Sequence, residues 1–295
     1  MAGSTLKKIV GRVYPFRRLA FFTQRLITRP GHREALSEVA CKRLPAKSSS
    51  SPLPQHELGE LGRNGYVMLD DLVTSDQVAQ MKEYFQDKQA FDRWNAASGL
   101  FDPAHPPADC HTAPFLNSDI AQSPWALKWA NDSRVLAIVE NWLGAKPTLS
   151  NLSVWWSYPG HDTPQEAECF HRDVDDLRFI KLFIYLSDVD EGAGPHVFVP
   201  GSHKHDGFNK IRRYSDSEVI EAFGQDGIKY FTGEQGSAFL ENTFGLHKGQ
   251  LPTHKPRLLF QAQYSLHPIG IYEYAPVSVE LGAPLDNYIN RLYVK

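Results

Sequence analysis

A His-x-Asp pair with a second histidine far along the chain constrains the fold more than any other feature of this sequence. The pair is His171 and Asp173, and the distant histidine is His247. Side chains alternate between the two faces of a β-strand, so both members of the pair would point to the same side. A histidine from a distant strand would then complete a three-ligand face on a metal ion. Two histidines and one carboxylate, with open positions opposite them, are the arrangement of non-haem Fe(II) oxygenases.

The sequence around this pair resembles the phytanoyl-CoA dioxygenase family of iron and 2-oxoglutarate oxygenases. After the pair come an apolar segment expected to be a strand (178–188), a Gly-Pro turn (191–195) and a short strand that ends in Pro-Gly-Ser-His (200–203). The resemblance covers roughly residues 57–265. It implies a mainly β fold, a cupin-like jelly roll or double-stranded β-helix, which binds Fe(II), the cosubstrate 2-oxoglutarate and O2 at one site.

His247 is the third metal ligand that the resemblance implies, because it stands ten residues before Arg257, as in the family. The chain has 12 histidines, so other candidates exist. His203 and His205 repeat the spacing of the pair, but they follow a Pro-Gly-Ser turn and we expect them at the surface. His254 stands between prolines in an expected loop. We therefore predict His171, Asp173 and His247 as the catalytic metal ligands.

Arg257 is the predicted anchor for the distal carboxylate of 2-oxoglutarate. A guanidinium is always charged and grips a carboxylate through two hydrogen bonds, whereas a buried arginine without an anion would be costly. We expect His247 to end one strand and Arg257 to begin its antiparallel neighbour, so that both point into one barrel mouth. Lys181, in an otherwise apolar strand, is a second candidate for binding an anionic group of cosubstrate or substrate. A lysine that extends its amine to solvent at the barrel edge is the alternative.

Asp173 also bears on the type of reaction, because halogenating relatives replace this carboxylate with a small residue. Its presence favours hydroxylation of a small organic molecule, lipid or glycan precursor, with formation of succinate and CO2. Two other classes stay open: a metal-dependent hydrolase with zinc on the same ligands, and an inactive jelly-roll binding module. Arg257 argues against the hydrolase, which needs no 2-oxoacid clamp, and the intact ligands argue against the inactive module. The identity of the substrate is not readable from the sequence.

Composition and charge indicate an ordinary globular chain. Its 295 residues are 42% hydrophobic and 22% charged, which predicts a packed core. A net charge of −3 gives no general attraction to nucleic acid. The three cysteines are widely spaced, which suits a reducing compartment such as the cytoplasm. No apolar run approaches the roughly 20 residues of a membrane span, and the start lacks the apolar core of a secretory signal.

Short apolar runs between Gly and Pro turns dominate after residue 144, which favours a jelly roll over a βαβ sheet. Before them we expect a strand at 65–69 and two flanking helices. One helix begins near Ser75, with Thr74 or Ser75 as N-cap, and the other spans 132–144 with a glycine stop. We divide the chain into a basic N-terminal arm (1–41), a Ser-, Pro- and Lys-rich linker (42–56) and a jelly-roll domain (57–295).

The arm carries eight Lys and Arg residues before its first acidic residue, Glu34. After Pro15 its pattern predicts an amphipathic helix with only Phe21 misplaced. Such a segment, residues 6–29, would lie on an anionic membrane surface. Two alternatives stay open: the apolar stripe packs on its own domain or on a partner subunit, or the start is a mitochondrial presequence in a eukaryote. The expected apolar side comprises Phe16, Leu19, Ala20, Phe22, Thr23, Leu26 and Ile27.

Overall fold

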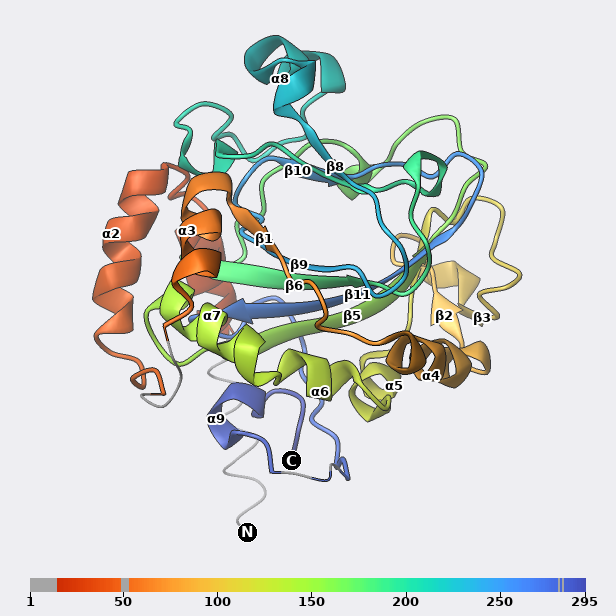
Figure 1. Ribbon diagram of the computed structural model, residues 1–295, viewed down its shortest axis with the longest axis horizontal. Helices are drawn as coiled ribbons and strands as arrows, with labels where there is room; N and C mark the ends of the chain where they lie inside the picture. Colours follow the sequence, from red (N-terminus) through yellow and green to blue (C-terminus); the bar gives the residue numbers. More distant parts are fainter. Residues whose placement is uncertain (1–14, 49–52, 281, 283) are drawn as a thin grey trace.

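Two facing antiparallel sheets form the centre of the protein, and helices cover them from outside (Figure 1). The computed structural model describes residues 15–48, 53–280, 282 and 284–295. The predicted jelly roll is confirmed. The larger sheet has the strand order β1 (Tyr66–Met68), β9 (Ala238–Glu241), β6 (Phe179–Tyr185), β11 (Arg257–Ser265), β5 (Thr148–Ser157) and β4 (Thr112–Pro114). The smaller sheet has the order β10 (His247–Gly249), β7 (His196–Phe198) and β8 (Lys229–Phe231).

The strands of the larger sheet are buried on both faces, because helices cover one face and the smaller sheet covers the other. On β11, Leu258, Phe260 and Ala262 belong to the main core beneath the helices. The alternate residues Arg257, Leu259 and Gln261 line a cavity between the sheets. Strand alternation therefore separates an apolar core from a polar cavity wall. Helices α5 (Asn117–Gln122), α6 (Ala126–Ala130), α7 (Ser133–Leu143) and α9 (Asn287–Asn290) pack below the larger sheet in Figure 1.

Two helices begin where their capping residues predict. The Asp132 carboxylate accepts hydrogen bonds from the first backbone amides of α7, and the helix ends at Gly144 with a φ of 81°. Thr74 caps α4 (Ser75–Gln86) and forms a reciprocal capping box with Gln77. Three further helices, α2 (Pro30–Cys41), α3 (Gln55–Asn64) and α8 (Asp216–Phe223), and the hairpin β2 (Ala90–Phe91)–β3 (Leu100–Phe101) lie around the sheets.

Two expectations about strands near the site are wrong. His171 is not part of a regular strand but forms an isolated antiparallel bridge with His247, and Asp173 follows in a loop. In addition, His247 begins β10 rather than ending a strand, and β10 and Arg257 of β11 belong to different sheets. The two residues still line one cavity because the two sheets face each other. A loop of seven residues, 250–256, is long enough to cross from one sheet to the other.

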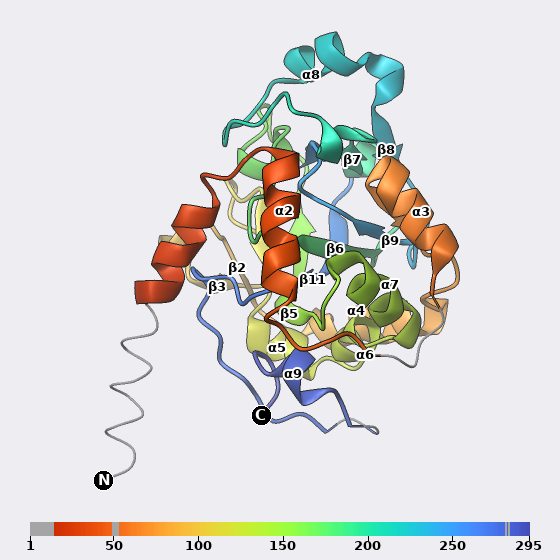
Figure 2. The ribbon, with the colours of Figure 1, turned by 90° about the vertical axis from the view of Figure 1, so that its left-hand side faces the viewer.

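The N-terminal arm packs on the jelly roll through the side that was expected to be polar. Residues 15–24 form a helix, and α2 follows it along the side of the molecule (Figure 2). Phe21, the residue that did not fit the apolar stripe, is the buried one, whereas the stripe itself faces outward. The amide nitrogen of Gln24 donates to the carbonyl of Val174 at 2.8 Å. The helix therefore binds the jelly roll through one buried aromatic ring and a hydrogen bond, and not through its apolar stripe.

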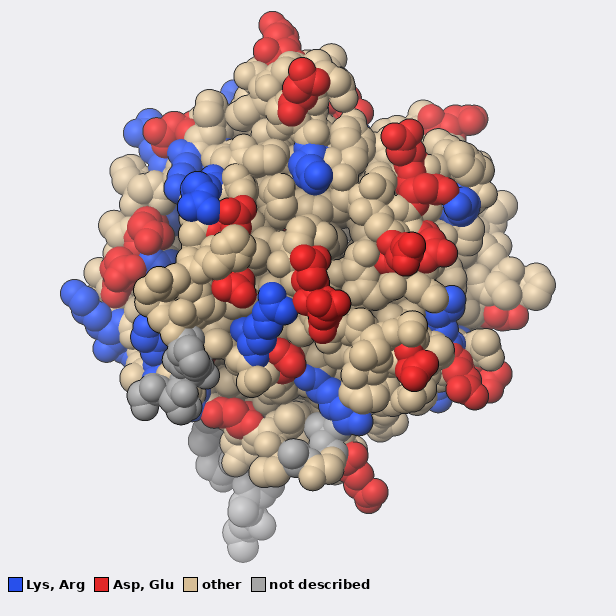
Figure 3. Space-filling model, viewed as in Figure 1, with Lys and Arg blue, Asp and Glu red and all other residues tan. Residues whose placement is uncertain are grey.

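The outer surface mixes charges of both signs on the face shown in Figure 3. The expected linker is partly packed, since the backbone and hydroxyl of Ser48 bind the carboxylate of Glu140 on α7. The placement of domain boundaries stays a prediction. Within residues 15–48, 53–280, 282 and 284–295, no helix is both long and apolar enough to cross a membrane.

Candidate metal centre and cosubstrate site

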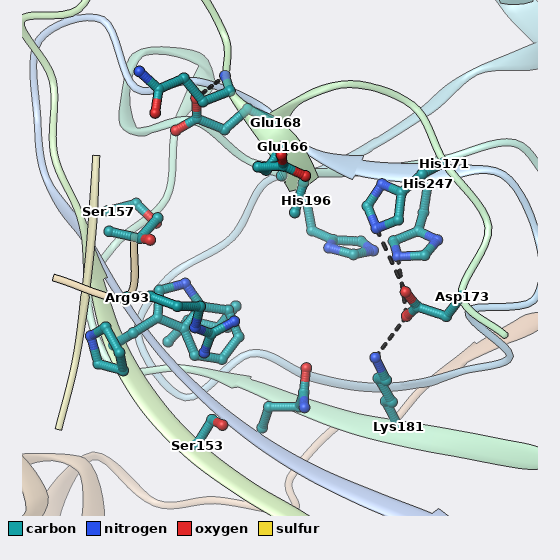
Figure 4. Close-up of a pocket in the computed structure, with 18 of the residues that line it drawn as sticks. Arg93, Ser153, Ser157, Glu166, Glu168, His171, Asp173, Lys181, His196 and His247 are labelled. Carbon is teal, nitrogen blue, oxygen red and sulfur yellow. Dashed lines mark hydrogen bonds and ion pairs between the residues drawn. The ribbon is translucent and has the colours of Figure 1, made fainter. Parts of the chain in front are cut away.

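His171, Asp173 and His247 converge on one point in the cavity (Figure 4). One ligand atom from each residue lies within 4.8 Å of the other two. The Asp173 carboxylate reaches both rings, with 3.5 Å from Oδ1 to Nε2 of His171 and 3.5 Å from Oδ2 to Nε2 of His247. Among the described residues this is the one group of three or more potential ligands that could hold a metal ion. The structure therefore brings together the three residues that the sequence predicts as ligands.

Backbone carbonyls fix both imidazole rings in the orientation that a metal requires. Nδ1 of His171 lies 2.9 Å from the carbonyl of Cys169, and Nδ1 of His247 lies 3.0 Å from the carbonyl of Gly245. A carbonyl only accepts, so each Nδ1 carries the proton and each Nε2 presents its lone pair. Burial, and then the neighbouring His247, lower the pKa of His171, which keeps its ring neutral near pH 7. The three donors fit a divalent transition metal.

Lys181 of β6 holds the aspartate of this group. Its Nζ lies 2.6 Å from Oδ2 of Asp173 and 3.5 Å from Oδ2 of Asp175. Burial opposes ionisation of Asp173, but the charge of Lys181 outweighs it, so the pKa of this carboxyl lies well below its usual range. The same ion pairs raise the pKa of Lys181 against its burial. Its ammonium is thus already engaged, and it lies inside the barrel instead of at the edge.

Arg257 is buried at the start of β11, with 3% of its surface exposed, and lines the same cavity. One Nη donates to the carbonyl of Gly194, and the other lies 3.4 Å from the hydroxyl of Ser157. Its Nε is buried without a hydrogen-bond partner among the described residues. Burial lowers the pKa of Arg257, yet the guanidinium remains charged at neutral pH. No carboxylate pairs with it in the described part of the chain, which leaves a buried cation beside the cavity.

Two buried polar residues beside the metal ligands were not anticipated. His196 of β7 lines the cavity, and its Nε2 lies 2.8 Å from Oε2 of Glu241 on β9. Burial raises the pKa of Glu241 to about 8, and burial and Arg257 hold the pKa of His196 well below its usual range. The proton therefore rests on Glu241, and the pair is neutral. The sequence feature that could have predicted this buried pair is the glutamate directly after the apolar run 238–240.

The remaining histidine candidates lie away from the metal ligands. His203 was expected at the surface, and this is wrong: only 6% of it is exposed. It packs against the turn at Gly65, where a β-carbon would stand 2.7 Å from its Nδ1. His254 is exposed and its Nδ1 lies 2.9 Å from the hydroxyl of Thr253. Cys169, near the pair in sequence, does not line the cavity.

The cavity between the sheets has a volume of about 540 Å³, which is the size range of small-molecule sites. The metal ligands, Lys181 and Arg257 all line it. Its floor is polar, with Asn151 and Ser153 from β5 beside Gln261 from β11. The fold and this donor set define a jelly-roll protein with a two-histidine, one-carboxylate metal centre.

Comparison with known proteins places the chain in a family. The model of the family Phytanoyl-CoA dioxygenase (PhyH) matches residues 61–258, about two thirds of the chain, so the chain belongs to this family. Ectoine dioxygenase of Sphingopyxis alaskensis is 23% identical over 170 residues, which are 53% of this chain and 52% of the relative. The chain thus matches about half the length of this curated relative.

Solved structures share the fold at low sequence identity. EctD from S. alaskensis, in complex with 2-oxoglutarate and 5-hydroxyectoine, has a TM-score of 0.51 at 20% identity, over 75% of this chain and 78% of that one. HygX from Streptomyces hygroscopicus, with nickel, 2-oxoglutarate and hygromycin B, has a TM-score of 0.51 at 18% identity, over 78% and 93%. The resemblance to this family seen in the sequence is confirmed.

Proposed function

We propose that this protein is an Fe(II)- and 2-oxoglutarate-dependent dioxygenase that hydroxylates a small organic molecule. The observation that carries the proposal is the convergence of His171, Asp173 and His247 in a cavity that Arg257 also lines. Their Nε2 and carboxylate atoms would hold Fe(II) on one face. Fe(II), when bound, supplies the activation of O2 that is coupled to oxidative decarboxylation of 2-oxoglutarate to succinate and CO2.

Arg257 would bind the distal carboxylate of 2-oxoglutarate, with the Ser157 hydroxyl as a second donor. Both groups are buried and lie 3.4 Å apart, so one carboxylate can reach both. Lys181, which we expected to bind an anionic group, is already bonded to Asp173. We therefore assign it the role of keeping the Asp173 carboxylate ionised and oriented toward the metal.

Iron-dependent formation of succinate tests this proposal directly. Purified protein with Fe(II), 2-oxoglutarate and O2 should convert 2-oxoglutarate to succinate, and His171→Ala or His247→Ala should abolish both iron binding and this turnover. His254→Ala is the matched control, because this histidine is exposed and lies outside the cavity. Full activity of His247→Ala together with loss in His254→Ala would show that the third ligand is misassigned.

The same assay distinguishes the two other classes. A hydrolase on these ligands would act with Zn²⁺ and would not consume 2-oxoglutarate. An inactive binding module would bind metal and form no succinate with any substrate. The buried, unpaired guanidinium of Arg257 favours the dioxygenase, because a hydrolase has no dicarboxylic cosubstrate to neutralise it.

We also propose that the N-terminal segment rests on an anionic membrane surface. Its apolar side chains project away from the jelly roll, and each is more than half exposed. Arg17 and Arg29 flank them, and cations near anionic lipid contribute about 1 kcal/mol each. Part of the predicted segment, residues 6–14, lies outside the described residues. The exposed stripe consists of Phe16, Leu19, Phe22 and Leu26.

Vesicle sedimentation tests the membrane proposal. The full chain should pellet with vesicles that contain phosphatidylserine at low salt, and much less with phosphatidylcholine vesicles. The double variant Leu19→Gln/Leu26→Gln should stay in solution, whereas Leu36→Gln, an exposed leucine on α2, should behave as the wild type. Equal sedimentation of the double variant, or no sedimentation of the wild type, would exclude this role.

A further inference from the structure

Four arginines that line the cavity also reach solvent: Arg25, Arg93, Arg212 and Arg213. They come from the N-terminal arm, from the turn after β2 and from the loop before α8. Arg212 and Arg213 form ion pairs with glutamates of the protein. The first two have no carboxylate within ion-pair distance in the described part of the chain. The cavity therefore has unbalanced positive charge at two points.

Arg212 and Arg213 show how an arginine at the edge of the cavity is neutralised when the protein supplies a carboxylate. One Nη of Arg212 donates to Oε1 of Glu218 at 2.6 Å, and the other donates to Oε2 at 3.2 Å. Arg213 lies 2.9 Å from a carboxylate oxygen of Glu166. Charge alone therefore does not mark a rim arginine as a binding residue, and Arg212 serves as an internal standard.

Arg93 lines the cavity from a hydrogen-bonded turn. The buried carboxylate of Asp92 accepts hydrogen bonds from the backbone amides of Trp94 at 2.8 Å and Asn95 at 3.2 Å. These hydrogen bonds order the backbone of the turn that carries Arg93. Figure 4 shows Arg93 across the cavity from His171, Asp173 and His247.

Arg25 brings the N-terminal arm into the cavity wall. Its guanidinium lies 3.5 Å from the carbonyl of Val174, the residue that follows the metal ligand Asp173. Gln24 donates to the same carbonyl, and the buried ring of Phe21 lies 5.2 Å from the guanidinium. These contacts seat the arm against the metal-binding loop, although the arm precedes the segment that the family model matches.

We propose that the substrate carries an anionic group, a carboxylate or a phosphate, which Arg93 and Arg25 bind. This rests on the proposed function and specifies its substrate class. Lys181 is paired to Asp173, Arg257 is assigned to 2-oxoglutarate, and the buried Arg172 donates to backbone carbonyls. Of the lining arginines that reach solvent, Arg93 and Arg25 are the two without a carboxylate at ion-pair distance among the described residues, although Arg25 also feels the charge of the buried Asp175. The polar floor supports this class, because a purely apolar substrate would cover amide and hydroxyl groups without pairing them.

Binding of simple anions to the loaded protein tests the substrate class without turnover. Protein with Fe(II) and 2-oxoglutarate, kept free of O2, is titrated with phenyl phosphate, benzoate and the neutral probe benzyl alcohol. Trp94 and Trp155 line the cavity and report binding through their fluorescence. We expect one of the anions to bind at least about tenfold more tightly than the alcohol, as a charge-assisted bidentate contact would give. The preferred anion distinguishes a phosphate from a carboxylate substrate.

Three variants locate the binding site. Arg93→Gln should lose most of this preference and Arg25→Gln part of it, whereas Arg212→Gln should keep it. Arg93→Gln should leave the KM for 2-oxoglutarate near the wild-type value, which separates a substrate contact from a cosubstrate contact. Equal binding of anions and alcohol, no binding of either anion at millimolar concentration, or unchanged affinity in Arg93→Gln would overturn the proposal. Absence of iron-dependent succinate formation would instead refute the proposed function and leave the binding result intact.

Discussion

Lys181 is buried against two carboxylates, and this contact explains how a metal-facing aspartate stays ionised inside a protein. An isolated buried carboxylate would take up a proton, because desolvation disfavours its charged form. The ammonium 2.6 Å away compensates for this and also fixes which oxygen of Asp173 is free. Outer contacts of this kind orient metal ligands and alter metal affinity.

Replacing Lys181 should therefore weaken the binding of iron more than the binding of 2-oxoglutarate. We expect Lys181→Met, which keeps most of the length of the side chain without its charge, to weaken Fe(II) affinity by about 10- to 100-fold. The KM for 2-oxoglutarate, measured at saturating iron, should change much less. The opposite result, intact iron affinity with a large rise in that KM, would return Lys181 to the cosubstrate-binding role expected from the sequence.

Arg257 gives the complementary prediction. Removing one partner of a buried charge pair costs roughly 2–5 kcal/mol, so Arg257→Ala should raise the KM for 2-oxoglutarate by tens to thousands of fold. Iron affinity should stay near the wild-type value, since no contact joins Arg257 to the three ligands. Arg257→Lys should recover little, because a lysine cannot make the two parallel hydrogen bonds. An unchanged KM in Arg257→Ala would refute the assignment.

His203 links one buried side chain to the pH dependence of stability. Burial lowers the pKa of His203 from about 6.5 to about 4. The unfolded chain therefore binds a proton more readily than the folded one. Its contribution to stability is complete above pH 6.5 and is lost as the pH falls toward 4, by about 2–3 kcal/mol. Urea unfolding should show that the free energy of unfolding falls less between these pH values in His203→Phe than in the wild type. The exposed control His56→Gln should lose as much as the wild type.

The helix at residues 15–24 shows how one element acquires a role that its own pattern does not predict. It docks through Phe21, the residue that breaks its amphipathic stripe, and through the polar side chain of Gln24. The receiving surface is the backbone at Gly270, which lies directly beneath the carbonyl of Arg17. The helix thereby reaches the loop that carries Asp173.

A methyl group at Gly270 should detach this helix. A β-carbon there would stand 2.2 Å from the carbonyl oxygen of Arg17 and 2.9 Å from the β-carbon of Phe21, so the helix must shift. We expect Gly270→Ala to lower stability by about 1–3 kcal/mol and to speed proteolytic cleavage in the arm. Gly282→Ala is the control, since no atom of the described residues lies within 4 Å of the corresponding position. Wild-type proteolysis of Gly270→Ala would show that the helix is not docked in solution.

At the scale of the whole molecule, the segment that carries His171 and Asp173 meets the start of β10 at the metal site. His171 and His247 exchange backbone hydrogen bonds of 2.9 and 3.0 Å, and Asp173 donates its amide to the carbonyl of Thr243. A metal ion on the three side chains would tie these segments together only in the folded state. Binding to the folded state alone stabilises it by mass action.

Metal and cosubstrate should therefore raise the melting temperature together. At ligand concentrations about 100-fold above Kd, the gain is about 2.7 kcal/mol for each site, which calorimetry or fluorescence melting detects easily. Fe(II) under anaerobic conditions should stabilise the wild type and should not stabilise His247→Ala. Arg257→Ala should keep the increment from iron and lose the one from 2-oxoglutarate. A melting temperature that does not respond to iron would argue against a metal centre.

The sequence by itself determined the fold class, the capped helices and the set of metal-binding candidates. These follow from local patterns: a capping residue such as Asp132, the β-turn chemistry, and motif residues whose order resembles a family. Strand alternation puts Arg257 and Gln261 on one face of β11, and both line the cavity. Local preferences suffice there because each feature depends on residues close in sequence.

Only the tertiary structure decided how these elements meet. It put His247 and Arg257 in different sheets, paired Lys181 with Asp173, and buried His203 against Gly65. It also turned the N-terminal helix so that Arg25 enters the cavity and the apolar stripe faces outward. These outcomes depend on contacts between segments far apart in the chain, whose energies are set by packing and desolvation. The periodicity of one segment does not indicate which distant part of the chain will pack against it.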